Sequence, residues 1–227
     1  MKCREIFRFK NFNICQDGAA MKITTDTILC GLLAPVEHGR RILDIGTGTG
    51  TVALLIAQRA PQANIIALEP HLTSFRTAKF NFLNSPYASR IKIFPTPLQQ
   101  FQPQNTYDLI ITNPPFFDDQ KIKNSPARHT SYLPLDELFT FVYHYLAPTG
   151  KFSIIYPYDK KHQVLSHAYE LGLFPERQFL IRDRNDTPVK RIFWTFTSNI
   201  NRTYKTEEII LSDKNGMYSK FYKQFLW

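Results

Sequence analysis

The fold of this chain is decided by the stretch RILDIGTGTG at residues 41–50. Residues 41–45 form an apolar run around one acid, which predicts a short buried strand. Glycines follow at every second position, Gly46, Gly48 and Gly50, where they allow a sharp turn and let a ligand approach the main chain closely. Apolar residues then recur at helical spacing through Arg59. The stretch therefore predicts a strand, a tight loop and the start of a helix.

The same alternation of strand and helix continues along the chain. Predicted strands lie at residues 41–45, 64–68, 91–94, 107–112, 151–156, 174–181 and 191–197, and predicted helices at 51–59, 72–83, 135–146 and 160–171. Such an alternation predicts an α/β fold with a mainly parallel sheet covered by helices on both faces. We expect seven strands, and the tail offers a further strand at 207–211 and a short helix at 218–227.

The residues before this alternation have a different pattern. Residues 7–10 alternate apolar and basic side chains, and the turn pair Asp17-Gly18 follows a second short apolar stretch. Thr24-Thr25-Asp26 then supplies capping residues for a short helix that Pro35 would end. We therefore divide the chain into an N-terminal extension at 1–34, made of a small β element and a helix, and one domain at 35–227.

Composition limits the class of protein. The 227 residues are 43% hydrophobic, which is enough for a sizeable core, and they contain neither a long apolar run nor a signal-peptide pattern at the start. Cys3, Cys15 and Cys30 are scattered and show no CxxC spacing, which argues against a disulfide framework and against a zinc site. We expect a cytoplasmic protein without a metal and without membrane contact, and we expect a monomer.

The net charge of +9 favours a polyanionic partner. Basic residues are spread along the chain instead of gathering in a tail, which favours a folded basic face over a disordered arm. A soluble basic protein with no nucleic-acid partner is the alternative. Charge alone places nucleic acid only slightly ahead of it.

The glycine loop has three interpretations: a plain tight turn, a dinucleotide site or a site for S-adenosylmethionine. The dinucleotide fingerprint spaces its glycines as GxGxxG, whereas this loop reads GxGxG after an acid and resembles motif I of the class I methyltransferases. S-adenosylmethionine carries positive groups and no phosphate, so a carboxylate nearby is favourable. An acid at the end of the next strand can accept hydrogen bonds from ribose hydroxyls. The residues predicted to bind the cofactor here are Asp44, Gly46, Gly48, Gly50, Glu69 and Pro70.

The second informative motif is Asn113-Pro114-Pro115-Phe116, directly after the predicted strand at 107–112. Two prolines stiffen the backbone and lack N–H groups, so the Pro114 carbonyl and the Asn113 side chain are expected to face one spot. Two acceptors there can hold an amino group and leave its lone pair free to attack a methyl group, while Phe116 offers a ring on which a planar base stacks. These four residues are the predicted catalytic set. A stiff loop without chemistry is the alternative.

This motif resembles motif IV, (D/N/S)PP(Y/F), of the amino-group methyltransferases. A narrower resemblance, to the bacterial tRNA1(Val) adenosine-37 N6-methyltransferases, spans nearly the whole chain. It implies a Rossmann-like class I methyltransferase fold, S-adenosylmethionine as cofactor and tRNA as partner. The resemblance is carried by residues 9–12, 21–26, 43–46, 99–100, 127–130 and 218–222, of which 21–26 is the specific part.

The resemblance also implies roles for individual residues. Lys22, Thr25 and Asp26 are implied to lie near the methionine end of the cofactor, although the last two also suit an ordinary helix N-cap. Asn113 and Phe116 are implied to hold the target adenine, and Asn113 is also predicted to contact the cofactor. One departure concerns the segment 96–98, where relatives usually carry an acid that meets the cofactor's adenine. The backbone N–H of Leu98 remains available for that contact.

A predicted substrate face surrounds the motif. The long loop at 117–132 suits substrate contacts, with a plain surface loop as the alternative. The C-terminal part interleaves basic residues with aromatic ones, a pattern that suits unstacked RNA bases. The residues predicted to bind substrate are Phe116, Lys121, Lys123, Arg128, His129, Lys190 and Arg191.

Three functions remain open at this point. The first is methylation of adenine N6 in tRNA, at position 37 of tRNA1(Val). The second keeps the chemistry and changes the substrate to a protein glutamine, to rRNA or to DNA. The third is a non-catalytic RNA-binding protein on the same scaffold. The intact Asn113 motif and Glu69 count against the third.

Overall fold

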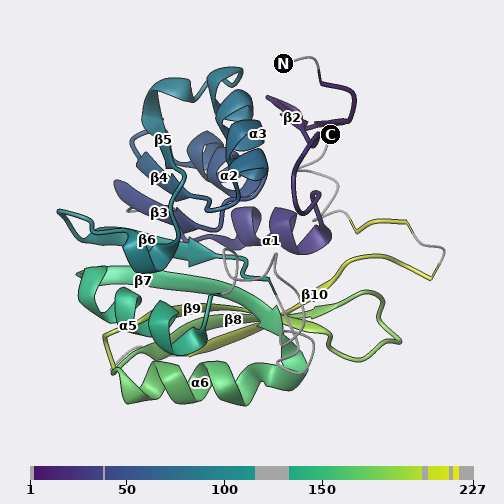
Figure 1. The fold of residues 1–227 in the computed structure, drawn as a ribbon. Coiled ribbons are helices and arrows are strands. Elements are labelled where there is room, and N and C mark those ends of the chain that lie inside the picture. The colour runs from purple at the N-terminus through teal and green to yellow at the C-terminus, as the bar shows by residue number, and fades with distance from the viewer. Residues whose placement is uncertain (1–2, 38, 116–132, 201–203, 215–216, 220–227) are drawn as a thin grey trace, which may run out of the picture.

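The sheet organises the structure, which is a computed structural model (Figure 1). It describes residues 3–37, 39–115, 133–200, 204–214 and 217–219. Eight strands form the main sheet in the order β10-β8-β9-β7-β6-β3-β4-β5. Their bounds are β3 Arg41–Ile45, β4 Asn64–Leu68, β5 Ile91–Phe94, β6 Tyr107–Thr112, β7 Leu146–Pro157, β8 Phe174–Arg182, β9 Arg191–Thr197 and β10 Lys205–Ile210.

Strand directions match the predicted Rossmann-like arrangement. The central pairs β3–β4, β3–β6, β4–β5 and β6–β7 are parallel, while β9 runs antiparallel to both β7 and β8. Parallel neighbours place the carboxyl ends of β6, β3 and β4 side by side at one edge of the sheet. In an open α/β sheet this edge is where ligands bind.

The expected count of seven strands is wrong, because β10 pairs in parallel with β8 and adds an eighth. Most of β10 is exposed, and its acids form ion pairs with β8, Arg177 with Glu207 and Arg182 with Glu208. An edge strand held partly by charged pairs shows little hydrophobic pattern. The tail strand was therefore visible in the sequence only as a possible addition.

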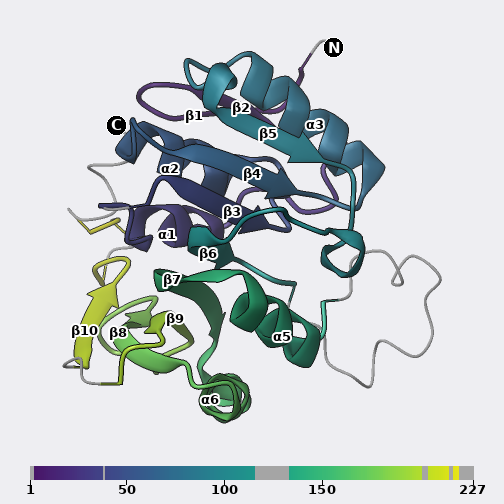
Figure 2. The same cartoon turned by 90° about the vertical axis from the view of Figure 1, so that its left-hand side faces the viewer.

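Helices cover both faces of the sheet (Figures 1 and 2). Alternate strand residues point to opposite sides, so Ile42 joins one apolar core and Leu43 the other. The first core is shared with α1 Thr25–Leu33, α2 Thr51–Arg59 and α3 Leu72–Leu83, and the second with α5 Leu135–Tyr145 and α6 Lys161–Glu170. Single turns of 3-10 helix lie at η1 Ala88–Arg90, η2 Leu98–Gln100 and η4 Tyr158–Lys160. The predicted helices at 51–59, 72–83, 135–146 and 160–171 are confirmed, while the predicted tail helix at 218–227 lies almost entirely outside the described residues.

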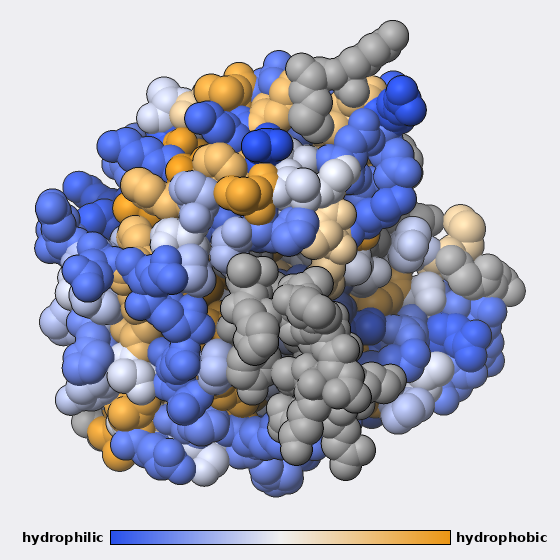
Figure 3. Space-filling view, in the orientation of Figure 1, coloured by the Kyte–Doolittle hydropathy of each residue, from blue (hydrophilic) through white to orange (hydrophobic). Residues whose placement is uncertain are grey.

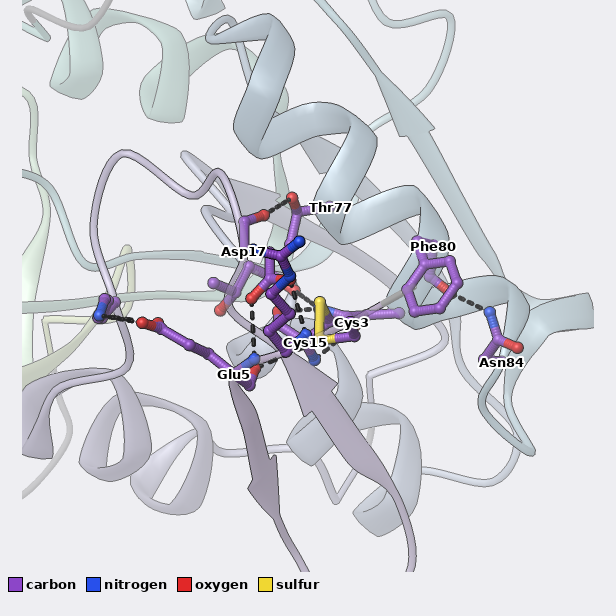
Figure 4. Close-up of a disulfide and its surroundings, with 11 residues drawn as sticks. Cys3, Glu5, Cys15, Asp17, Thr77, Phe80 and Asn84 are labelled. Atoms are coloured by element: carbon purple, nitrogen blue, oxygen red, sulfur yellow. Dashed lines mark hydrogen bonds and ion pairs between the residues drawn. A yellow bond between two sulfur atoms is a disulfide. The ribbon is translucent and has the colours of Figure 1, made fainter. Parts of the chain in front are cut away.

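The first residues form a small antiparallel pair, β1 Ile6–Arg8 with β2 Asn13–Cys15. This pair is tied to α3, since the Asn81 amide accepts from the backbone N–H of Cys15 and donates to its carbonyl. Thr77 Oγ1 also donates to the carbonyl of Asp17 (Figure 4). The predicted β element and helix are present, and the division at residue 34 stays a prediction.

The prediction that the cysteines form no disulfide framework is wrong for one pair. Cys3 and Cys15 form a disulfide beside the start of the β1–β2 pair (Figure 4), while Cys30 is a free, buried thiol. The pairing of β1 with β2 brings together two cysteines that are 12 residues apart. Spacing along the chain does not reveal this proximity, because it depends on where the chain turns.

The face drawn in Figure 3 is mostly hydrophilic, with hydrophobic residues in small groups. Exposed apolar side chains of the fold include Leu72 and Leu83 of α3 and Phe94 of β5. Among the described residues, no helix is both long and apolar enough to cross a bilayer.

Candidate active site

The candidate site lies at the carboxyl edge, where three segments follow three neighbouring strands. The glycine loop follows β3, Glu69 follows β4, and the Asn113 motif follows β6. A cavity at this edge is lined by residues from all three segments, among them Gly46, Pro70, Pro114 and Pro115. Leu98 and Thr96 line the same cavity. The sheet order therefore brings together the two motifs that the sequence singled out.

The glycine loop owes its shape to backbone conformations that other residues rarely adopt. The φ angles of Gly46, Gly48 and Gly50 are +72°, +58° and +85°. The N–H groups of Gly46 and Thr47 both donate to the carbonyl of Leu68 at 2.9 Å, which ties the loop to the end of β4. No atom of the described residues lies within 4 Å of a Cβ built on Gly46 or Gly48, so backbone conformation is the observed reason for glycine at those two positions.

Gly50 carries a second constraint, and its replacement is a test of the loop. A Cβ on Gly50 would lie 2.5 Å from Phe82 Cε1, in addition to the cost of the positive φ. Gly50→Ala is expected to lower the free energy of unfolding by about 2–4 kcal/mol. Gly172→Ala is the matched control, because Gly172 has a φ of +67° and no atom near its Cβ. Denaturant unfolding measures both, and equal losses would contradict the packing argument.

Asp44 is buried near the end of β3, directly before the glycine loop. Its Oδ2 accepts a hydrogen bond from Thr47 Oγ1 at 2.5 Å, and its carboxyl also accepts from the backbone N–H of Ala53 in α2. Burial, helped by the charge of Glu69, raises the pKa of Asp44 to about 7 against the opposing effect of these two hydrogen bonds. The hydrogen bond from Thr47 therefore fixes Asp44 against the loop, and the carboxyl has a pKa well above that of an exposed aspartate.

Glu69 is fixed at the end of β4 by two backbone groups. Oε2 accepts from the N–H of Gly48 at 2.8 Å, and Oε1 accepts from the N–H of His71 at 2.9 Å. Burial raises the pKa of Glu69, and these two hydrogen bonds oppose the rise. Each carboxylate oxygen can accept more than one hydrogen bond. Glu69 is therefore a pre-oriented acceptor for a pair of hydroxyl groups.

Asn113 begins the proline motif and is half-buried. Its Nδ2 donates to the hydroxyl of Thr27 in the first turn of α1, at 3.2 Å. The preceding Thr112 is buried, and its hydroxyl donates to the carbonyl of Ile45 at the end of β3. These contacts hold the start of the motif against α1 on one side and against β3 on the other.

Three predicted cofactor residues lie in other surroundings. Lys22 is exposed and forms an ion pair with Glu5 at 2.7 Å. Asp26 lies 2.7 Å from Arg191 Nε, burial raises its pKa, and the charge of Arg191 lowers it. Thr25 begins α1 and is half-buried. Contacts of these three residues with a cofactor stay predictions.

The predicted substrate residues divide into two groups. Lys190 and Arg191 both form ion pairs with Asp183, the second at 2.7 Å, so their described contacts are with acids of the protein. Their contact with substrate stays a prediction. The others lie outside the described residues: Phe116, Lys121, Lys123, Arg128 and His129.

Two features of the site were missed from the sequence. Thr27 contacts Asn113 across 86 residues, and Asp183 forms ion pairs with Lys190 and Arg191 at the start of β9. Thr27 carried a weak local signal, because it follows the N-cap Thr24 by three residues. Asp183 carried no local signal in the sequence.

Several known proteins resemble this chain in sequence. Residues 21–169 match the model of the methyltransferase small domain family. The chain is 38% identical over 223 residues to the tRNA1(Val) (adenine(37)-N6)-methyltransferase of Bacteroides fragilis, covering 95% of this chain and 93% of the relative. It is 39% identical over 194 residues to the protein of the same name from Trichodesmium erythraeum, covering 82% and 81%.

Solved structures show the same fold at low sequence identity. A protein described as a predicted O-methyltransferase from Agrobacterium tumefaciens superposes with a TM-score of 0.68 at 16% identity, covering 88% of this chain and 94% of that one. An S-adenosylmethionine-dependent O-methyltransferase from Thermotoga maritima gives 0.55 at 14% identity, covering 81% and 68%. The expected Rossmann-like methyltransferase fold is therefore confirmed.

Proposed function

We infer the function from one premise: this chain belongs to the methyltransferase small domain family and to the tRNA1(Val) (adenine(37)-N6)-methyltransferases. On that premise it transfers a methyl group from S-adenosylmethionine to N6 of an adenosine in tRNA. One observation carries the proposal. Pro114 and Pro115 line the same cavity as Gly46 of the glycine loop and Pro70, the residue after Glu69, in a chain that matches these relatives over nearly its whole length.

The residues present fit this cofactor. Gly46 and Gly48 leave open space where side chains would stand, so the main chain is accessible to a ligand. Glu69 offers fixed acceptors for ribose hydroxyls, and the carboxyl of Asp44 favours a positively charged methionine end. When bound, S-adenosylmethionine supplies an electrophilic methyl group on a positive sulfonium.

The Asn113 motif supplies the acceptor side of the reaction. Asn113 Oδ1 and the carbonyl of Pro114 are proposed to accept the two protons of the target amino group, which leaves its lone pair free to attack. The nitrogen forms a bond to the methyl carbon as the bond from sulfur to that carbon breaks. The methylated nitrogen then loses one proton to water. Catalysis on this account comes from positioning and fixed dipoles, with no separate general base.

The finer assignments are proposals as well. We propose position 37 of tRNA1(Val) as the site, on the names of the relatives, and a monomer that works in the cytoplasm without a metal. Phe116 is proposed to stack on the adenine, and the basic residues of 121–129 to contact the RNA backbone.

The pKa of Asp44 predicts how cofactor affinity depends on pH. With that pKa at about 7 in the free protein, the carboxyl is mostly protonated below it. A positively charged cofactor favours the carboxylate, so binding below that pH releases a proton, and affinity should rise with pH and level off above about 7. Burial also raises the pKa of Glu69, which acts in the same direction. Calorimetry across this range should show the rise, and Asp44→Asn should flatten it; affinity that falls as pH increases would contradict the assignment.

The substrate is tested by giving the purified protein labelled S-adenosylmethionine with either unmodified total tRNA or protein release factors. Label in tRNA is expected. Label found only in protein would favour glutamine methylation, and cofactor binding without transfer to either substrate would favour a non-catalytic RNA-binding protein.

A further inference from the structure

The amide of Asn113 is held from one side by a hydroxyl that the sequence did not assign to the site. Nδ2 of Asn113 donates to Thr27 Oγ1 at 3.2 Å. Thr27 lies in the first turn of α1 and is half-buried, whereas Asn113 follows β6. The contact joins the N-terminal helix to the residue that is proposed to face the target amino group.

We propose that Thr27 is a positioning residue that determines which end of the Asn113 amide faces the substrate. This inference rests on the proposed function, because it concerns an amino group that donates hydrogen bonds. Such a group needs Oδ1 as its acceptor, whereas an amide turned by half a rotation would present Nδ2, which also donates. The two orientations have nearly the same shape, so hydrogen bonding, not packing, chooses between them.

Thr27 is an acceptor toward Asn113 when its own hydroxyl donates to Thr24, which is one of the two directions open to that pair of hydroxyls. The backbone N–H of Thr27 donates to Thr24 Oγ1 at 3.2 Å, and the two hydroxyl oxygens lie 3.1 Å apart. Thr24 Oγ1 therefore already accepts one hydrogen bond, and it can accept the hydroxyl proton of Thr27 as its second. With its only proton turned toward Thr24, Thr27 Oγ1 presents lone pairs to Nδ2. Oδ1 of Asn113 is then the end left for the substrate.

The first turn of α1 is held firmly enough for this contact to set an orientation. Asp26, next to Thr27, pairs with Arg191 of β9 at 2.7 Å. Cys30, one turn further along α1, is fully buried and donates from Sγ to the carbonyl of Thr112 at 3.6 Å. The helix therefore contacts the motif strand at two points, and the spacing between the hydroxyl and the amide is fixed.

Thr27→Val removes the hydroxyl and keeps the β-branched shape. It is expected to lower kcat for tRNA methylation by about tenfold, with KM for tRNA changed by less than about twofold. The dissociation constant for S-adenosylmethionine and the thermal unfolding midpoint should stay near those of the unaltered protein. Thr27→Ser, which restores the hydroxyl, should recover most of kcat.

Thr206→Val is the matched control. Thr206 of β10 also accepts a hydrogen bond from a side-chain amide, Gln178 Nε2 at 2.8 Å, but it lies on the edge strand of the sheet. The same chemical change there is expected to leave kcat unaltered.

A second measurement follows the Asn113 amide itself. In ¹⁵N-labelled protein its side-chain amide signals are identified by their absence from Asn113→Ala. They should shift and exchange faster with water in Thr27→Val, and return in Thr27→Ser. Full kcat in Thr27→Val, or a loss of kcat with unchanged amide signals, would overturn the positioning role. If the unaltered protein fails to methylate tRNA at all, the proposed function fails, whereas the amide signals still test the contact.

Discussion

Asn113→Ala is expected to lower kcat for tRNA methylation by about a hundredfold to a thousandfold, the range seen when one fixed polar group is removed from an active site. The variant loses the side-chain acceptor that is proposed to hold the amino group. Asn113 is half-buried, and its described side-chain bond is the one to Thr27, so folding should suffer little. Initial rates with labelled S-adenosylmethionine and unmodified tRNA measure the loss.

Two further variants make this result specific. Asn113→Asp keeps an acceptor oxygen and should retain more activity than the alanine variant. Asn84→Ala removes an exposed asparagine whose Nδ2 donates to the Phe80 carbonyl at the end of α3, and it should methylate at the normal rate (Figure 4). Full activity of Asn113→Ala would refute the assignment of the motif as catalytic.

Glu69→Ala is expected to weaken S-adenosylmethionine binding by about a hundredfold or more, because two hydrogen bonds to a charged group are lost together. The change also removes the acceptor for the N–H groups of Gly48 and His71, so the glycine loop loses the hydrogen bond that ties it to the end of β4 through Glu69. Calorimetric titration with S-adenosylmethionine measures the dissociation constant.

The glutamine variant helps to distinguish the loss of hydrogen bonds to the cofactor from the loss of hydrogen bonds to the glycine loop. Glu69→Gln keeps one acceptor oxygen and should bind with intermediate affinity. Glu170→Ala, an exposed acid of α6 that accepts from Ser166, should bind the cofactor as the unaltered protein does. If Glu69→Ala binds S-adenosylmethionine with unchanged affinity, Glu69 does not bind the ribose of the cofactor.

Local signals in the sequence were enough for the two motifs and for most of the fold. Residues 41–50 and 113–116 sit at strand ends that periodicity locates, and sheet order then brings the strand ends together. The acid at the end of β4 was predicted for the same reason. Features of this kind depend on a few neighbouring residues, so a pattern along the chain contains them.

Contacts between distant segments were not predictable in this way. The pairing of Asp26 with Arg191 joins the first turn of α1 to the start of β9, and Lys190 and Arg191 both form ion pairs with Asp183. The Cys3–Cys15 disulfide depends on the turn between β1 and β2. Charge and spacing show which residues are available for such pairs, whereas the pairing itself is decided by packing of the whole sheet.

The central claim is tested most directly by nucleoside mass spectrometry of a tRNA1(Val) transcript after incubation with the purified protein and S-adenosylmethionine. The account predicts that N6-methyladenosine appears, and that it is absent when guanosine replaces the adenosine at position 37. A transcript that gains no N6-methyladenosine, while the protein binds S-adenosylmethionine, would contradict it.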